Sequence, residues 1–184
     1  MIHITSVHAD VNSYASLQLL LPQDEIRDFD FDGTYWGNTW VPLQAELVAE
    51  ESYEIGDFAS LETVLGVLVC SDKALMCLLP VLSGEIEILP LEVKNSDHRY
   101  SILNPLNVID CLDEPESMIV RSVFSGRIIA IEEYKFLEKS LSGVGLFKIP
   151  QTVTKTVFAT DLFYNIVRQS RLTGLEFRHI SRVI

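Results

Sequence analysis

Four carboxylates stand within seven residues near the middle of the chain, at Asp110, Asp113, Glu114 and Glu116. Paired carboxylates serve as general acid and general base in many hydrolases, so this spacing raises hydrolysis as one hypothesis. No nucleophile, oxyanion-binding group or basic side chain that would stabilise a transition state stands near them in the sequence. Because Pro115 interrupts the run, an acidic turn is the favoured interpretation, and we expect no catalytic residue and no enzymatic activity.

A second group of carboxylates alternates with aromatic residues in the run Asp28-Phe29-Asp30-Phe31-Asp32-Gly33. Carboxylates at alternate positions before a glycine have the spacing of the first half of a calcium-binding loop. Position 12 of such a loop falls on Thr39 instead of a bidentate Glu, and no flanking helices are evident. The favoured interpretation is an alternating strand with both Phe side chains inward and the three Asp side chains outward; a calcium-dependent binding module is the alternative.

Aromatic residues follow this acidic run directly, and both tryptophans of the chain, Trp36 and Trp40, lie within five residues of each other. Clustered aromatics near charge are typical of interface anchors, and also of a lid over a small core, which is the favoured interpretation. Both interpretations stay open. The candidate partner-binding residues are Asp28, Asp30, Asp32, Trp36, Trp40, Asp113 and Glu114.

Other residues with chemical potential are scattered. The cysteines Cys70, Cys77 and Cys111 are odd in number, lack CxxC spacing and stand among aliphatic residues, which predicts buried thiols without disulfides or a zinc ribbon. The four histidines show no metal-ligand spacing, and the segment 140–148 lacks the pattern of a phosphate loop. We therefore expect neither a metal nor a cofactor.

Composition indicates one globular domain over residues 1–184, with 48% hydrophobic and 22% charged residues. Residues 1–100 carry 17 acidic against 4 basic side chains, whereas residues 101–184 carry 9 against 10. An acidic field repels nucleic acid and anionic membranes and attracts basic proteins, although solubility alone explains it equally well. The N-terminus has no signal-peptide pattern and the apolar run 64–70 is too short to span a bilayer, so we expect a cytoplasmic protein.

The elements that must position these residues are many strands and two helices. One helix, at about 71–82, begins with Ser71 as N-cap and meets Pro80, which predicts a kink or an end. The other, at about 160–172, is expected to be closed by Gly174. Strand patterns cover 64–70, 85–93 around Pro90, 100–110, 118–124 and 127–133 across a two-residue Ser125-Gly126 turn, 144–149, 154–159 and 175–180. This arrangement predicts an α+β fold in a single domain, built on a mostly antiparallel sheet.

Several segments together resemble a known family. They are Gly56-Asp57-Phe58, the run Tyr100 to Ser117 (YSILNPLNVIDCLDEPES), Gly145-Leu146-Phe147-Lys148, Thr160-Asp161 and Thr173-Gly174-Leu175-Glu176-Phe177. In these segments the chain is similar to immunity family eleven of bacterial polymorphic-toxin systems. The likeness covers most of residues 56–180, while the acidic residues 1–55 match only loosely. Lys148 departs from the family, which more often has Arg there.

The resemblance implies an immunity protein that binds and neutralises a cognate toxin stoichiometrically, blocking its active site. With the acidic first half and the expected cytoplasmic location, the partner would be a basic toxin domain acting in the cytosol, a nuclease first, rather than nucleic acid or a membrane. Asn104, Asn107 and Asp110 are expected to be structural, because Asn and Asp side chains tie backbone groups at irregular strand ends such as that around Pro105.

Overall fold

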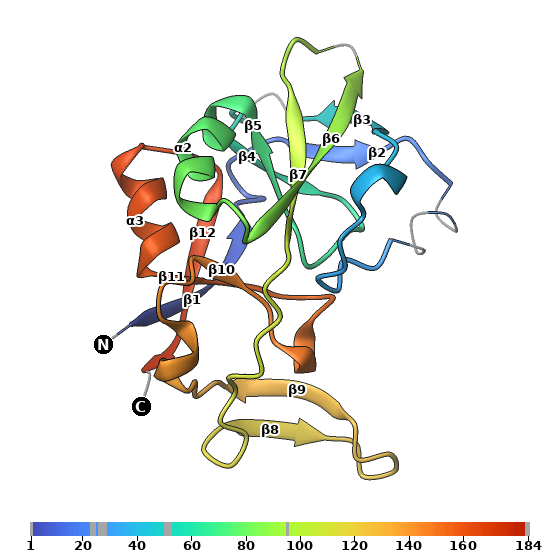
Figure 1. Cartoon of the computed structure of the whole chain (residues 1–184). Coiled ribbons are helices and arrows are strands. Elements are labelled where there is room, and N and C mark those ends of the chain that lie inside the picture. The colour runs from blue at the N-terminus through green and yellow to red at the C-terminus, as the bar shows by residue number, and fades with distance from the viewer. Residues whose placement is uncertain (1, 23–24, 26–28, 50–52, 95, 183–184) are drawn as a thin grey trace.

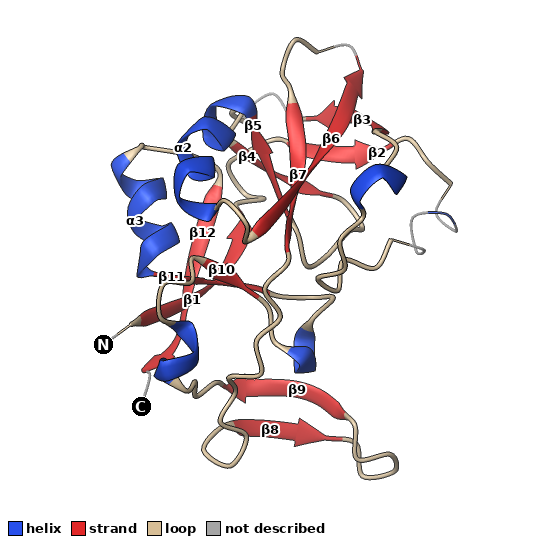
Figure 2. Ribbon diagram, viewed as in Figure 1, coloured by secondary structure: helices blue, strands red, loops and turns tan. Residues whose placement is uncertain are grey.

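Six strands close into a small barrel at one end of the molecule (Figures 1 and 2). The computed structural model describes residues 2–22, 25, 29–49, 53–94 and 96–182. The barrel strands are β2 (Ser16–Leu19), β3 (Leu43–Val48), β4 (Phe58–Leu61), β5 (Leu68–Ser71), β6 (Ile86–Lys94) and β7 (Tyr100–Pro105). Around the barrel their order is β2-β3-β6-β7-β5-β4, and the neighbours are antiparallel except in the pairs β2–β4 and β3–β6. Leu17, Ala45, Leu89 and Ile102 are among the aliphatic side chains of its buried core.

A four-stranded antiparallel sheet lies next to the barrel, in the order β10-β11-β1-β12. Its strands are β1 (His3–Ala9), β10 (Leu146–Phe147), β11 (Val157–Thr160) and β12 (Leu175–Arg182). The helices α2 (Asp72–Leu82) and α3 (Asp161–Gln169) contribute their apolar faces to one core shared with β1, β5, β7 and β11. The first and last strands of the chain pair with each other, so the two ends of the chain lie close together (Figure 1).

A two-stranded hairpin of β8 (Met118–Arg121) and β9 (Ile128–Glu133) forms the far end of the molecule, opposite the barrel (Figure 1). Ile119 and Ile131 pack against a third core, which includes Phe136, Phe147 and Phe158. Three short 3-10 helices complete the described elements: η1 (Gly37–Thr39), η2 (Glu138–Leu141) and η3 (Pro150–Thr152).

Both helices begin where the sequence predicts. The Ser71 hydroxyl accepts a hydrogen bond from the backbone N–H of Ala74 at 3.3 Å, and the Thr160 hydroxyl accepts one from Leu162 at 3.2 Å, as N-cap side chains do. Pro80 lies inside the last turn of α2, which ends two residues later. The α+β fold with a mostly antiparallel arrangement of strands is confirmed.

The end of the second helix differs from the prediction. The helix stops at Gln169, because Arg171 takes a left-handed conformation with φ of 52° and the N–H of Leu172 bonds to the carbonyl of Val167 at 3.0 Å. This is the bonding of a Schellman cap, with Arg in the place usually taken by glycine. Gly174 does not close the helix. It permits close packing instead, since a Cβ there would lie 2.1 Å from the carbonyl oxygen of Phe58.

Several strands are shorter than their apolar patterns. Residues 64–67 form a loop before β5, and β7 ends at Pro105 instead of near Asp110. Pro90 lies inside one continuous strand, near the point where β6 exchanges β7 for β3 as its paired neighbour. The predicted Ser125-Gly126 turn is a longer loop, closed by a hydrogen bond from the N–H of Ser122 to the carbonyl of Arg127, and the strand register shifts after Val120.

In the part of the chain that the structure describes, no helix has the length and apolar character needed to cross a membrane.

Candidate functional site

The acidic and aromatic segment near the N-terminus forms a loop that covers one side of the barrel. We call residues 29–40, between β2 and β3, the docked loop. It is not the strand that the alternation predicted, although Phe31 is buried and the side chains of Asp30 and Asp32 are exposed, as that pattern requires. Phe29, Phe31, Trp36 and Trp40 contact one another with ring centroids 5.7 to 6.4 Å apart, and all four pack against the barrel core.

The two tryptophans are therefore half-buried parts of this aromatic cluster. The indole N–H of Trp40 donates to the carbonyl of Pro90 at 3.1 Å, which fixes its ring against β6. The indole nitrogen of Trp36 is buried without a hydrogen-bond partner in the described structure. Tyr35, which directly precedes Trp36, is instead 68% exposed to solvent.

The outward side of the docked loop carries the exposed carboxylates. Asp30, Asp32, Tyr35 and Trp36 line a depression of about 260 Å³. Hydrogen bonding to Thr34 holds the pKa of the Asp32 carboxyl below its usual value, so this group is anionic at neutral pH. Asp28, the first acid of the run, lies outside the described residues.

A buried carboxylate holds the second half of the docked loop on the barrel. Glu87, on β6, is 6% exposed and accepts hydrogen bonds from the backbone N–H groups of Trp36 at 3.0 Å and Gly37 at 2.7 Å. Its third donor is the side-chain amide of Asn104 at 3.1 Å, which also donates to the carbonyl of Thr34 at 3.0 Å. Three donors compensate the charge of a carboxylate that has lost most of its water.

A buried lysine holds the first half. Lys148 is 0% exposed, and its ammonium donates to the backbone carbonyl of Phe31. Burial lowers the pKa of Lys148 from 10.5 to about 8, while the neighbouring Asp32 carboxylate opposes the shift. Gly33 has a φ of 92° and lies against the motif segment, residues 100–117. A Cβ on Gly33 would lie 2.4 Å from Cγ2 of Val108 in that segment. We call Glu87, Asn104 and Lys148 the brace of the docked loop.

The other predicted motif residues behave differently from one another. The Asn107 side-chain amide donates to the carbonyl of Leu146 at 3.3 Å, and the backbone carbonyl of Asn107 accepts from the N–H of Lys148 at 2.8 Å. These two bonds join the segment after β7 to β10 and the residue that follows it. Asp110 is exposed, and within the described chain its carboxylate takes part in no hydrogen bond or ion pair. Hydrogen bonds therefore support the structural interpretation at Asn104 and Asn107, whereas none supports it at the Asp110 side chain within the described residues.

The second acidic group lies at the base of the β8–β9 hairpin. The Glu114 carboxylate pairs with Arg121 and accepts a hydrogen bond from the Gln151 side chain at 3.0 Å. Asp113 is half-buried, and its carboxylate caps the turn by accepting from the N–H of Glu116 at 3.4 Å. Neither Asp113 nor Glu114 is among the residues that line the depression beside Asp30 and Asp32.

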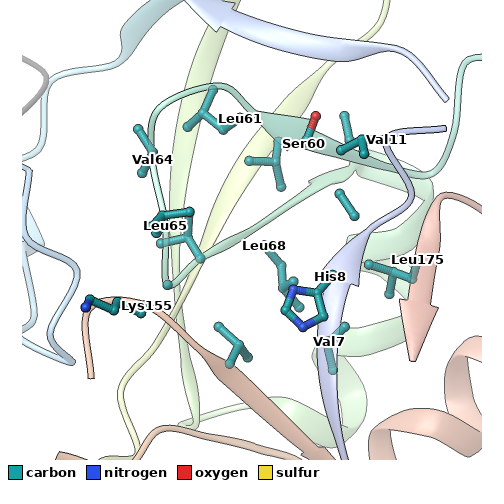
Figure 3. A pocket seen from close by; sticks show the side chains of 16 residues that line it. Val7, His8, Val11, Ser60, Leu61, Val64, Leu65, Leu68, Lys155 and Leu175 are labelled. Atoms are coloured by element: carbon teal, nitrogen blue, oxygen red, sulfur yellow. The ribbon is translucent and has the colours of Figure 1, made fainter. Parts of the chain in front are cut away.

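A cavity of about 190 Å³ lies between the loop after β4 and strand β1 (Figure 3). Its lining is aliphatic except for a few groups that include His8 and Lys155. Burial lowers the pKa of His8, and its Nε2 atom lies 3.0 Å from the Ser6 hydroxyl. The aliphatic lining would offer apolar contact to a ligand. His8 and Lys155 are the titratable side chains of this lining, and no carboxylate is among the described residues that form it.

Among the described residues, no three His, Cys, Asp or Glu side chains lie close enough together to hold a metal ion. The three cysteines are free, and Cys70 and Cys111 are buried as predicted, whereas Cys77 is only partly buried. Burial raises the pKa of the Cys111 thiol to about 12.

Sequence comparisons support the resemblance carried by the motif segments. No curated protein matches the chain. The sequence model of an immunity protein family matches residues 18–182, and so includes the docked loop, the brace and the hairpin. Since this match spans most of the chain, the protein belongs to the immunity protein family Imm11.

Proposed function

We propose that this protein is an antitoxin that neutralises a cognate bacterial toxin by stoichiometric binding, with no turnover of its own. Membership of an immunity family implies a cognate toxin as the partner. The observation that supports a binding site is the docked loop, whose exposed Asp30, Asp32 and Tyr35 project from a segment fastened by the buried brace. A segment that is already ordered loses little conformational entropy when a partner binds, which favours high affinity.

The charge of this surface favours a basic partner. Exposed carboxylates beside aromatic rings complement a patch of Lys and Arg, and the charge of −12 on the whole chain would steer such a partner toward it. A toxin that handles nucleic acid carries such a patch for phosphate groups, so a cytosolic nuclease is the first candidate. Enzymes that act on nucleotide cofactors or on cytosolic proteins come next. In this proposal the protein works in the cytoplasm, and the acids of the docked loop block the phosphate-binding region of the toxin.

Titration tests the proposal directly. The partner to use is the toxin domain produced from the gene immediately upstream, with its own activity as the readout. Inhibition should saturate near one molecule of this protein per toxin, with a dissociation constant of about 1 nM or below and an interface of about 1,600 Å² or more. Complete protection at strongly substoichiometric amounts would instead show turnover.

A matched pair of variants tests the docked loop. Asp30→Asn removes one exposed charge from the loop, and Asp97→Asn removes one from the exposed turn between β6 and β7. Asp30→Asn should slow association with the toxin severalfold while Asp97→Asn leaves it within twofold, because charges at an interface act mainly on the association rate. Equal effects of the two variants on the association rate would mean that the docked loop is not part of the interface.

A further inference from the structure

The β8–β9 hairpin exposes the two most solvent-accessible large apolar side chains of the described residues. Val123 is 90% exposed and Phe124 is 98% exposed, both in the loop at the tip of the hairpin. Met118 and Ile129, on the strands behind the tip, are also more than half exposed. A single exposed apolar residue needs no explanation, but a cluster that includes a phenylalanine in full contact with water marks an interaction site.

The tip is ordered by its own hydrogen bonds. The Ser122 hydroxyl accepts from the backbone N–H groups of Phe124 and Ser125, each at 3.3 Å. The backbone of Ser122 pairs with Arg127 at 2.8 Å and with Gly126 at 2.9 Å. These bonds fix the backbone that presents Phe124, so the ring cannot easily fold back onto the strands.

The base of the hairpin is fixed to the body of the molecule. The Ser117 hydroxyl accepts from the N–H of Lys135 at 2.9 Å and donates to the carbonyl of Asp113 at 2.7 Å. The ion pair of Arg121 with Glu114, which also bonds to Gln151, connects β8 to the segment after β10. The hairpin is thus a rigid projection with an apolar tip.

We propose that this hairpin is an insertion arm, whose tip of Val123 and Phe124 enters a concave, apolar-floored site on the toxin. The inference rests on the proposed function and adds a second contact to it. A convex tip fits a concave partner, and a buried aromatic side chain in a pocket is the usual centre of a tight interface.

Charge disfavours a second copy of this chain as the occupant, and area shows that the tip alone cannot make the whole interface. A stable interface needs about 800 Å² from each partner, whereas a phenylalanine and a valine together bury only a fraction of that. The wider contact must come from the rest of the hairpin, where Arg121 and Arg127 are exposed beside the tip and Glu116, Glu132 and Glu133 are exposed toward the base. Two copies would bring two charges of −12 together, whereas a basic toxin would be attracted by that charge.

The test compares truncations of equal kind. The double variant Val123→Ser, Phe124→Ser removes the apolar tip, and Met76→Ser removes a 72% exposed apolar side chain from α2. Wild type and both variants are titrated against the toxin domain from the upstream gene, with melting temperature and sedimentation measured in parallel. The tip variant should bind about 30-fold more weakly or worse, mainly through faster dissociation, with its melting temperature unchanged. Met76→Ser should bind like the wild type.

The outcomes separate the two proposals. If the tip variant binds the toxin as tightly as the wild type does, the insertion arm is overturned and the antitoxin function still stands. Absence of binding by the wild type overturns both. A wild-type dimer that the tip variant converts to a monomer would assign the tip to a second copy, against the inference. A second test does not depend on truncation: the photo-crosslinker benzoylphenylalanine in place of Phe124 should form a covalent crosslink to the toxin. If the complex forms but no crosslink to the toxin appears, the tip does not enter the toxin.

Discussion

At the scale of single residues, buried polar side chains hold the surface that exposed ones offer. Asn104 is completely buried, and both hydrogens of its amide are used, one for Thr34 and one for Glu87. Its side-chain oxygen has no partner within the described structure, which costs free energy that the two donated bonds must exceed. An aliphatic side chain could not replace Asn104, because the carbonyl of Thr34 and the Glu87 carboxylate would each lose a hydrogen-bond donor.

Lys148 gives a prediction about pH. Between its folded pKa of about 8 and its ordinary value of 10.5, the unfolded lysine binds a proton that the folded one has released. Raising the pH through this range therefore favours the folded state. The free energy of unfolding of the wild type, relative to Lys148→Met, should rise by up to about 3 kcal/mol across the range.

Chemical denaturation of wild type and variant at several pH values between neutral and alkaline measures this difference. Lys155→Met is the control, because it removes an exposed lysine a few residues away. A difference between wild type and Lys148→Met that stays constant with pH would mean that the ammonium keeps its charge through its bond to Phe31.

At the scale of elements, strand β6 supports the docked loop through one side chain. Glu87→Gln replaces one carboxylate oxygen with an NH2 group, which would face the backbone N–H of either Trp36 or Gly37, because these two donors bond to different oxygens. We expect a loss of about 2 to 3 kcal/mol in unfolding free energy, because hydrogen bonds to a charged acceptor are lost and buried donors remain. Glu92→Gln makes the same change at an exposed site on the same strand and should stay within about 0.5 kcal/mol.

The measurement is thermal melting combined with toxin affinity. A loosened loop should also bind the toxin more weakly, in proportion to the order it has lost. If Glu87→Gln is as stable as Glu92→Gln, then the carboxylate does not hold the loop, and the brace depends on Asn104 and Lys148 alone.

The elements differ in how much of them the sequence predicts. The helix starts depend on local signals, the hydroxyls of Ser71 and Thr160, and these can be read without the fold. Strand ends depend on which neighbour is present, so β5 begins only at Leu68, after the start of its apolar pattern, and β7 ends at Pro105, before the end of its own. The parallel pairs β2–β4 and β3–β6 that complete the barrel join segments far apart in the chain, and no local pattern indicates them.

The same distinction applies to the candidate site. Alternation correctly predicted that Phe31 would be inward and Asp30 and Asp32 outward, but it could not say that the aromatic rings cover a barrel. Glu87 escaped notice because an alternating Glu-Ile strand normally turns its carboxylates to water. Its burial follows from the docked loop, which covers that face of β6 and supplies the donors.

At the scale of the whole molecule, the two halves of the chain would act on different steps of binding. The acidic residues are concentrated in residues 1–100, with 17 acidic against 4 basic side chains, whereas the apolar tip belongs to the nearly neutral second half. Long-range charge governs how often two proteins meet in a productive orientation. Buried apolar contact governs how long they stay together.

This division predicts that salt and tip truncation change different rate constants. Raising ionic strength from about 0.05 to 0.5 M shortens the Debye length severalfold, so association with the toxin should slow by about tenfold or more. Dissociation should change little over the same range. Because exposed charges are screened and the apolar tip is not, the Val123→Ser, Phe124→Ser variant should keep the salt dependence of association while dissociating faster. Surface-plasmon or stopped-flow kinetics on wild type and tip variant at several salt concentrations resolve both constants. An association rate indifferent to salt would exclude electrostatic steering by the acidic half, whatever the tip variant does.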